Sequence, residues 1–338
     1  MSRSAILVRC CVATLFGAVF VAFEVGAVLP QRTFVASNGV DANPCSIALP
    51  CRSFATAISK TNPTGEVIVV DSAGYGPVTI TQSVAIIAPP GVYAGISVPA
   101  LMSGIVVNGS GILVKLAGLT INGQGGQNGI QFLQGARLVV ERCTVVGMAS
   151  VGLADSASSS QLYVADSTFR YSGNGGIDIS AGTATIDRAH LENNGDDGVH
   201  VTGPPFATVD VLVRDSVAST NGGAGFAVTG NTSSHTRLTV ERSTAFQNTV
   251  HGFFGTSSGA TSVQVFVTDS RALENVQDGV FATGAGATAV VTGSTLARNV
   301  QYGMVQASSS AVLTLQNNTV EQNTLGATLG TITKVSVQ

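Results

Sequence analysis

The chain has 338 residues, of which 44% are apolar and 10% charged, with 40 glycines and no tryptophan. This apolar content excludes a disordered chain, which would be poor in such residues. The net charge of −3, without a basic patch interleaved with aromatic residues, excludes a nucleic-acid-binding protein.

Residues 1–27 have the three parts of a secretory signal peptide. Arginines precede an apolar run from Cys10 to Phe23, and Val25-Gly26-Ala27 is a small-residue cleavage site. The alternative is an uncleaved segment that anchors the protein in a membrane, although Glu24 would be costly inside a span. We expect cleavage, and therefore a protein that is secreted, periplasmic or on the cell surface.

Residues 28–65 are predicted to form an N-terminal cap. Cys45 and Cys51 enclose a short loop and would pair as a disulfide in an oxidising compartment. A metal site is the alternative, but no third and fourth ligand lies nearby in the sequence. The stretch from Ser53 to Lys60 predicts one short amphipathic helix with Ser53 as its N-cap. Such a helix is suited to cover the open end of a repeat protein.

Residues 66–338 repeat a glycine that is followed by apolar residues at alternate positions, as in Gly176-Ile177-Asp178-Ile179 and Gly198-Val199-His200-Val201. From Gly129 to Gly326 the intervals between these glycines are 22 to 27 residues, a period that indicates a solenoid. Each repeat holds two further short runs that alternate in the same way. One repeat therefore predicts one three-strand rung of a parallel β-helix.

Other repeat architectures do not fit the sequence. Helical repeats need a 3.6-residue period and few glycines, and leucine-rich repeats need the L-x-x-L-x-L-x-x-N pattern. Calcium-binding nonapeptide β-rolls need G-G-x-G-x-D strings, which are absent. We predict an all-β fold, a single-stranded parallel β-helix of about twelve rungs with strands stacked ~4.8 Å apart.

Two columns of the repeat are predicted to have structural roles. An asparagine lies four residues before each later glycine, where Asn tolerates a left-handed bend and can form a ladder of amide hydrogen bonds. These residues are Asn194, Asn221, Asn248, Asn275 and Asn299. A second column alternates in charge and should fix the register through ion pairs between rungs. It comprises Arg142, Asp166, Arg188, Asp215, Arg242 and Asp269.

The segment from Phe34 to Cys45, a strand and an Asp-x-Asn-Pro turn, and the segment from Pro50 to Ile58 resemble the N-terminal signature of secreted pectate-lyase-like proteins. The later repeats look like the β-helix repeats of the same superfamily, so the resemblance covers nearly all of the mature chain. It implies a right-handed β-helix whose helix plugs the barrel. It leaves the activity open, because the superfamily also contains hydrolases, epimerases, adhesins and phage tailspikes.

The residue two positions after each glycine is expected to point away from the core. In this row Asp178 and His200 lie on adjacent rungs, with Asp196 and Asp197 just before His200. Carboxylates beside a histidine suit general acid–base catalysis, so these four are candidate catalytic residues. The pair of aspartates resembles that of polygalacturonase-type hydrolases, but the third aspartate, the G-H-G turn and the R-x-K strand of those enzymes are missing. The alternative is that Asp196 and Asp197 only help to form a bend of the chain, and that Asp178 and His200 are a pair on the surface.

The same outward row places Phe254 above Phe281, which are candidate ligand-binding residues for sugar rings or a partner protein. Packing along the stack is the alternative. Three consecutive 27-residue intervals carry longer connections after the glycine strand, and these should form a wall beside the row. Insertions of this kind often map to a binding face.

The sequence has no motif for nucleotide, metal or covalent catalysis, so we predict no cofactor and no metal. Its last residues, Thr331 to Gln338, keep a strand-like alternation without a capping helix. An exposed strand edge favours pairing with another chain, so we expect self-association through this C-terminal rung.

These features favour a secreted β-helix protein that contacts extracellular or cell-wall polysaccharide. One alternative is a non-enzymatic structural or adhesive surface protein that binds a protein partner. The other is a polysaccharide lyase or glycoside hydrolase with acid–base residues around His200. Because no catalytic set is complete, the sequence favours binding over enzymatic activity.

Overall fold

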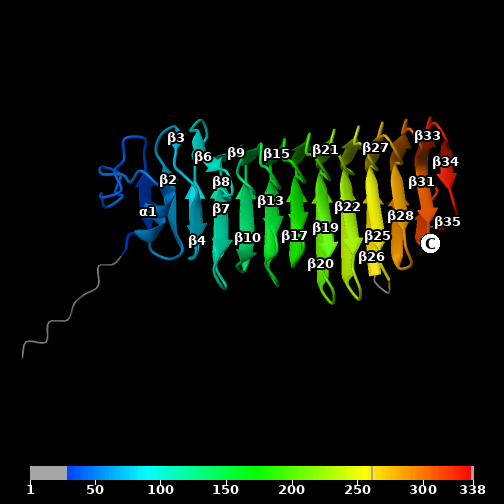
Figure 1. Ribbon diagram of the computed structural model, residues 1–338, viewed down its shortest axis with the longest axis horizontal. Helices are drawn as coiled ribbons and strands as arrows, with labels where there is room; N and C mark the ends of the chain where they lie inside the picture. Colours follow the sequence, from blue (N-terminus) through cyan, green and yellow to red (C-terminus); the bar gives the residue numbers. More distant parts are fainter. Residues whose placement is uncertain (1–28, 260–261, 336–338) are drawn as a thin grey trace, which may run out of the picture.

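The computed structural model describes residues 29–259 and 262–335, so the predicted signal peptide lies outside the described residues. The chain winds into an elongated stack of strands, with the N-terminal and C-terminal rungs at opposite ends (Figure 1). Three sheets of 13, 11 and 11 strands run along the stack, and we call them sheets A, B and C. From β2 onwards each turn of chain adds one strand to A, then B, then C. The result is about eleven complete turns, close to the predicted twelve.

The strand bounds are as follows. Sheet A consists of β1 (Arg32–Val35), β2 (Gly65–Val69), β5 (Val84–Ile87), β8 (Leu113–Ala117), β11 (Arg137–Glu141), β14 (Gln161–Ala165), β17 (Thr183–Asp187), β20 (Thr208–Arg214), β23 (His235–Glu241), β26 (Ser262–Thr268), β29 (Ala287–Thr292), β32 (Ala311–Thr314) and β35 (Ile332–Lys334). Sheet B consists of β3 (Ala73–Gly74), β6 (Ala94–Pro99), β9 (Leu119–Gln124), β12 (Thr144–Val146), β15 (Thr168–Arg170), β18 (His190–Glu192), β21 (Val217–Ser219), β24 (Thr244–Phe246), β27 (Arg271–Leu273), β30 (Thr295–Ala297) and β33 (Thr319–Glu321). Sheet C consists of β4 (Val78–Ile80), β7 (Ile105–Asn108), β10 (Ile130–Gln134), β13 (Leu153–Asp155), β16 (Ile177–Ile179), β19 (Val199–Gly203), β22 (Phe226–Gly230), β25 (Phe253–Ser257), β28 (Val280–Thr283), β31 (Tyr302–Ala307) and β34 (Gly326–Leu329).

The core lies inside the stack, where the inward residues of the three sheets meet. In β16 the side chains of Ile177 and Ile179 are buried while Asp178 between them faces outward and is half-buried. The same alternation in every rung places one apolar column above another, because neighbouring strands pair in parallel and in register. The period-two pattern of the sequence therefore builds both the core and an outer face with regularly spaced side chains.

The recurring glycine is required by close backbone packing. A Cβ added at Gly198 would lie 2.6 Å from the carbonyl oxygen of Gly225 and 2.8 Å from the Cβ of Ala218. Gly176 meets Gly198 in the same way, with its added Cβ 2.6 Å from the carbonyl oxygen of Gly198. A side chain at this position would push neighbouring rungs apart.

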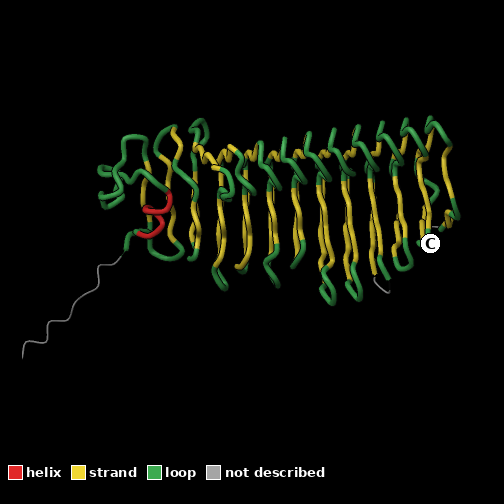
Figure 2. Tube along the Cα trace, in the orientation of Figure 1, coloured by secondary structure: helices red, strands yellow, loops and turns green. Residues whose placement is uncertain are grey.

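The N-terminal end carries the predicted short helix. Helix α1 (Phe54–Ser59) begins after Ser53, whose hydroxyl accepts a hydrogen bond from the Thr56 amide. The helix buries Phe54 and lies across the first rungs, where it is drawn in red in Figure 2. Cys45 and Cys51 are joined by a disulfide, as predicted. Because β1 pairs with β2 and belongs to sheet A, the division of the chain at residue 65 stays a prediction.

The asparagine column forms the predicted ladder inside the corner between sheets B and C. In Asn221 the Nδ2 group donates to Oδ1 of Asn248 at 3.0 Å, and Asn248 repeats this contact to Asn275 at 3.0 Å. The expected left-handed conformation of these asparagines is wrong. It is the residue before each of them that has a positive φ, such as Thr220 (52°) and Gln247 (53°). That residue turns the corner, which leaves the asparagine side chain pointing inward.

The alternating charged column occupies the corner between sheets A and B, where its residues have positive φ. Arg188 Nε lies 2.7 Å from Asp166 Oδ1, and Arg242 Nε lies 2.9 Å from Asp215 Oδ1 on the next pair of rungs. The hydrogen bond from Arg188 holds the pKa of Asp166 below its usual range. Ion pairs between rungs therefore form at two steps of the predicted column.

At the C-terminal end β35 pairs with β32 on one side. In the last pair of sheet C, Thr328 lies opposite Met304 and Leu329 lies opposite Val305. The outward residue is predicted two positions after each glycine, which would pair Val305 with Thr328, so at this step the prediction is wrong by one residue. Self-association through this end stays a prediction. In the described part of the chain, no helix has the length and apolar character needed to cross a membrane.

Candidate functional site

The outward row of sheet C brings together the residues that the sequence selected. Asp178 pairs with His200, His200 with Ala227, Ala227 with Phe254, and Phe254 with Phe281, on the adjacent strands β16, β19, β22, β25 and β28. The side chains of Asp178, His200, Phe254 and Phe281 are all half-buried. The row thus has an acidic end and an aromatic end, separated by the one small residue, Ala227.

Asp197 is the carboxylate closest to the histidine. Its Oδ2 lies 3.7 Å from His200 Nδ1, and its Oδ1 accepts a hydrogen bond of 2.6 Å from the Ala224 amide. On its other side the His200 ring contacts the hydroxyl of Thr229, with 3.2 Å between Nε2 and Oγ1. His200 is therefore held between a carboxylate of its own rung and a hydroxyl of the next rung. Asp196 is exposed beside this pair.

Burial changes the acidity of two carboxyl groups in this cluster. Burial raises the pKa of Asp178 to about 6, while His200 lowers it and the charges of Asp197 and Asp196 raise it further. Burial also raises the pKa of Asp197 to about 7, against the lowering effect of the Ala224 amide. Groups that titrate near neutral pH are suited to exchange protons with a substrate.

The aromatic end contains a third ring that the sequence did not predict. Phe254 and Phe281 have ring centroids 5.9 Å apart, and His251 stacks on Phe281 at 4.5 Å with an angle of 7° between the rings. His251 is 5% exposed, and its Nδ1 lies 3.2 Å from Asp278 Oδ2. His251 is therefore a buried part of the stack and not a surface residue. The sequence signal for this burial is that His251 lies immediately before a repeated glycine, because residues at that position pack against the next rung.

Asp155 is a buried acid that the sequence reading missed. It occupies an inward position of β13, in register with Ile179, and is 2% exposed. Its Oδ1 accepts a hydrogen bond of 3.0 Å from the Ala157 amide, whereas its Oδ2 has no partner. Burial raises the pKa of Asp155 to about 7. The alternation Leu153-Ala154-Asp155 already placed this carboxyl on the inward side.

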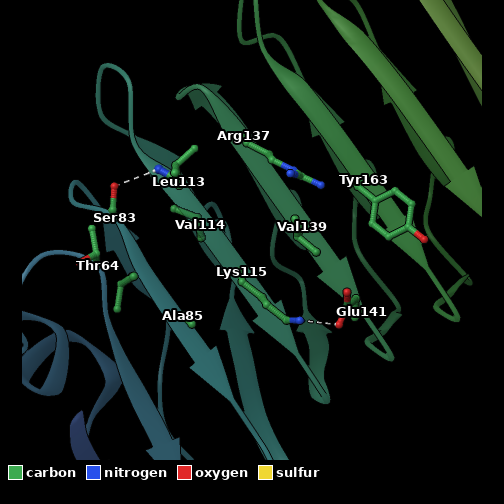
Figure 3. Close-up of a pocket in the computed structure, with 11 residues that line it drawn as sticks. Thr64, Ser83, Ala85, Leu113, Val114, Lys115, Arg137, Val139, Glu141 and Tyr163 are labelled. Atoms are coloured by element: carbon green, nitrogen blue, oxygen red, sulfur yellow. Dashed lines mark hydrogen bonds and ion pairs between the residues drawn. The ribbon is translucent and has the colours of Figure 1, made fainter. Parts of the chain in front are cut away.

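Shallow clefts on the outer face of sheet A were also missed. The first has a volume of about 490 Å³ and lies over β5, β8, β11 and β14, where Leu113, Lys115, Arg137, Glu141 and Tyr163 line it (Figure 3). A second of about 260 Å³ shares Arg137 and Tyr163 with it and continues onto β17. The period-two pattern predicts outward side chains here, but not the hollow that they leave between rungs.

The cysteines and acidic groups do not form a metal site within the described residues. No group of three or more His, Cys, Asp or Glu side chains there is arranged to hold a metal ion. Cys143 is buried at the corner between sheets A and B, where its backbone amide donates to Ser167 Oγ at 3.1 Å. Burial raises the pKa of its thiol to about 11, so it is a structural residue rather than a nucleophile.

Comparison with known proteins agrees with this architecture. Residues 103–265 match the family model described as a right handed beta helix region. No curated protein matches the chain by sequence. Among solved structures, a pectate lyase, Pel9A, is similar with a TM-score of 0.63 and 18% identity over 88% of this chain and 80% of its own.

Two other solved structures have the same fold at low identity. The catalytic unit of a GH87 α-1,3-glucanase from Streptomyces thermodiastaticus strain HF3-3 has a TM-score of 0.56 and 15% identity over 82% of this chain and 63% of its own. The Dettilon tailspike protein has a TM-score of 0.59 and 11% identity over 89% of this chain and 68% of its own. At such identities the likeness concerns the fold. The chain thus has a right-handed parallel β-helix fold, which its residues 103–265 match by sequence and which it shares with these solved structures.

Proposed function

We propose that the protein is exported and binds an extended extracellular or cell-wall polysaccharide on the outer face of sheet C. The single observation that carries this proposal is the row of Asp178, His200, Phe254 and Phe281 on consecutive rungs of one sheet, with only Ala227 between its two halves. Such a row offers carboxylates and an imidazole to sugar hydroxyls at one end. At the other it offers aromatic rings to the apolar faces of sugars.

The long connections support an extended ligand. The turns that follow β19, β22 and β25 stack on one another, since the Asn231 amide donates to the Gly203 carbonyl and the Ser258 amide donates to the Gly230 carbonyl. They form a continuous edge at the ends of the strands that carry His200 and Phe254. The similar solved structures include a pectate lyase and an α-1,3-glucanase, which favours a carbohydrate over other polymers. The disulfide favours an oxidising compartment outside the cytosol.

Removing the aromatic end should weaken binding. We expect the double variant Phe254→Ala/Phe281→Ala to bind its glycan about tenfold more weakly, since each half-buried ring that contacts a sugar contributes of the order of 1 kcal/mol. Hits from a glycan array on the full chain would be measured by isothermal titration calorimetry. Phe266→Ala is the matched control, because Phe266 is a half-buried phenylalanine on the outer face of sheet A. Equal affinities of the double variant and the wild type would contradict the proposal, and no glycan hit would favour the adhesive alternative.

The raised pKa values of Asp178 and Asp197 favour a second candidate, a lyase or hydrolase that uses these residues with Asp196 and His200. Reducing-end and unsaturated-product assays on each bound glycan would detect cleavage. If cleavage occurs, Asp197→Asn should lower the rate by about 100-fold or more, because an acid that is protonated near neutral pH is lost. Asp210→Asn on sheet A should retain the rate. Bound glycans that remain intact would exclude this candidate and leave binding alone.

A further inference from the structure

The outer face of sheet A carries a candidate second site, which is separate from the row on sheet C. Its cleft of about 490 Å³ holds two cations, Lys115 and Arg137, and one carboxylate, Glu141 (Figure 3). Lys115 Nζ lies 2.8 Å from Glu141 Oε2, so this pair neutralises itself. One positive charge, that of Arg137, is therefore left over in a protein whose net charge is negative.

Arg137 is free because of its neighbours along the sheet. In register it lies between Leu113 on β8 and Gln161 on β14, neither of which is acidic. Within residues 29–259 and 262–335 its guanidinium makes no hydrogen bond or ion pair. A planar guanidinium matches a carboxylate or a sulfate through two parallel hydrogen bonds. The cleft thus presents a guanidinium group with free N–H donors to an anion.

The surroundings of Arg137 suit a ring with polar substituents. Tyr163 lies on the next rung, and the Arg137 side chain extends towards it across the cleft (Figure 3). The adjoining cleft of about 260 Å³ adds the amide of Gln161 and the hydroxyls of Thr183 and Thr185 to the same two residues. An aromatic ring beside an amide and hydroxyls can stack on a sugar and pair with its hydroxyl groups.

We propose that these two joined clefts form a second binding site, which takes a sugar unit that carries a carboxylate or a sulfate ester. Arg137 binds the anionic group, Tyr163 stacks on the ring, and Gln161 with Thr183 contacts the hydroxyls. The choice of a sugar rests on the proposed function. The location of the second site and its preference for an anionic group rest only on the residues of sheet A.

The same sheet contains a matched control for Arg137. Arg237 occupies the same outward row on β23 and lines another cleft, of about 330 Å³. Its guanidinium is already satisfied, since Nη1 lies 3.4 Å from Asp210 Oδ2 and Nε donates to Gln264 Oε1 at 3.1 Å. Substitution of either arginine with glutamine removes one surface charge. Only Arg137→Gln removes a guanidinium group whose N–H donors have no partner.

The test is calorimetric titration of the full chain with three trisaccharides: tri-glucuronate, sulfated maltotriose and neutral maltotriose. We expect the anionic probes to bind and Arg137→Gln to weaken them about tenfold or more, with Arg237→Gln unchanged. Tyr163→Ala should weaken binding by a similar factor and Tyr163→Phe should retain it. A preference between the two anionic probes would identify the anionic group. Inorganic sulfate alone should bind far more weakly than sulfated maltotriose.

Three results would overturn the proposal: equal losses in Arg137→Gln and Arg237→Gln, neutral maltotriose binding as tightly as the anionic probes, or no binding of any probe. The double variant Phe254→Ala/Phe281→Ala separates the two sites. If it loses the glycan that binds on sheet C while Arg137→Gln changes nothing, only the second site fails. If Arg137→Gln alone abolishes binding, the site on sheet C fails instead.

Discussion

Replacement of Asp155 with asparagine is expected to stabilise the solenoid above pH 7 and to change little near pH 4. The folded chain raises the pKa of Asp155 to about 7, compared with about 4 in an unfolded chain. The folded chain favours the protonated Asp155 carboxyl. Its full contribution to the free energy of unfolding is present below pH 4 and is lost as the pH rises from 4 to 7. The full difference corresponds to about 4 kcal/mol in the free energy of unfolding. Asparagine keeps the contact with the Ala157 amide and carries no charge.

The measurement is the urea midpoint of the wild type and the variant at pH 4 and pH 8. Asp269→Asn is the control, because Asp269 is an exposed acid at a corner with a φ of 49°, which asparagine tolerates. The wild type should lose stability between the two pH values more steeply than Asp155→Asn. Parallel pH profiles for the two proteins would show that water reaches the Asp155 carboxyl.

Loss of one ladder residue, in Asn248→Ala, should destabilise the middle of the stack by about 3–5 kcal/mol. The Asn248 side chain is fully buried and makes four hydrogen bonds. Alanine would leave the backbone amide of Asn221 buried without a partner, which costs about 1–3 kcal/mol, and would remove three further hydrogen bonds of about 1 kcal/mol each. Thermal unfolding followed by circular dichroism would measure the loss.

Two asparagines outside the middle of the ladder serve as controls. Asn174 is exposed and makes one side-chain contact, to Ser150, so Asn174→Ala should change stability by less than about 0.5 kcal/mol. Asn323 is the half-buried end of the ladder and should show an intermediate effect. If Asn248→Ala and Asn174→Ala cost the same, the ladder would not stabilise the corner.

The register of the candidate site was predictable because it follows from one spacing. The glycine before each strand of sheet C packs under the carbonyl of the next rung, so residues at equal distances from it must align. This places Asp178 beside His200 and Phe254 beside Phe281, as the strand pairing confirms. At β34 the rule fails, since Gly326 lies opposite Tyr302 instead of Gly303.

Other features depend on three-dimensional detail that a repeat pattern does not contain. The left-handed corner residues vary in type, from Thr220 to Gln247, so composition gave no sign of them. The two joined clefts on sheet A depend on the lengths of side chains from three or more rungs and on the free charge of Arg137. The burial of His251 depends on stacking with Phe281 across rungs.

The alternating corner column also limits how such a protein can change in length. Because a rung contacts mainly its neighbours, a solenoid can lengthen or shorten by duplication or deletion of whole rungs. Removal of a single rung between Arg142 and Asp269 would bring like charges together at the new junction, whereas removal of two would restore opposite charges. In this region, gain and loss of rungs in pairs should therefore be the less costly route for evolution and for design.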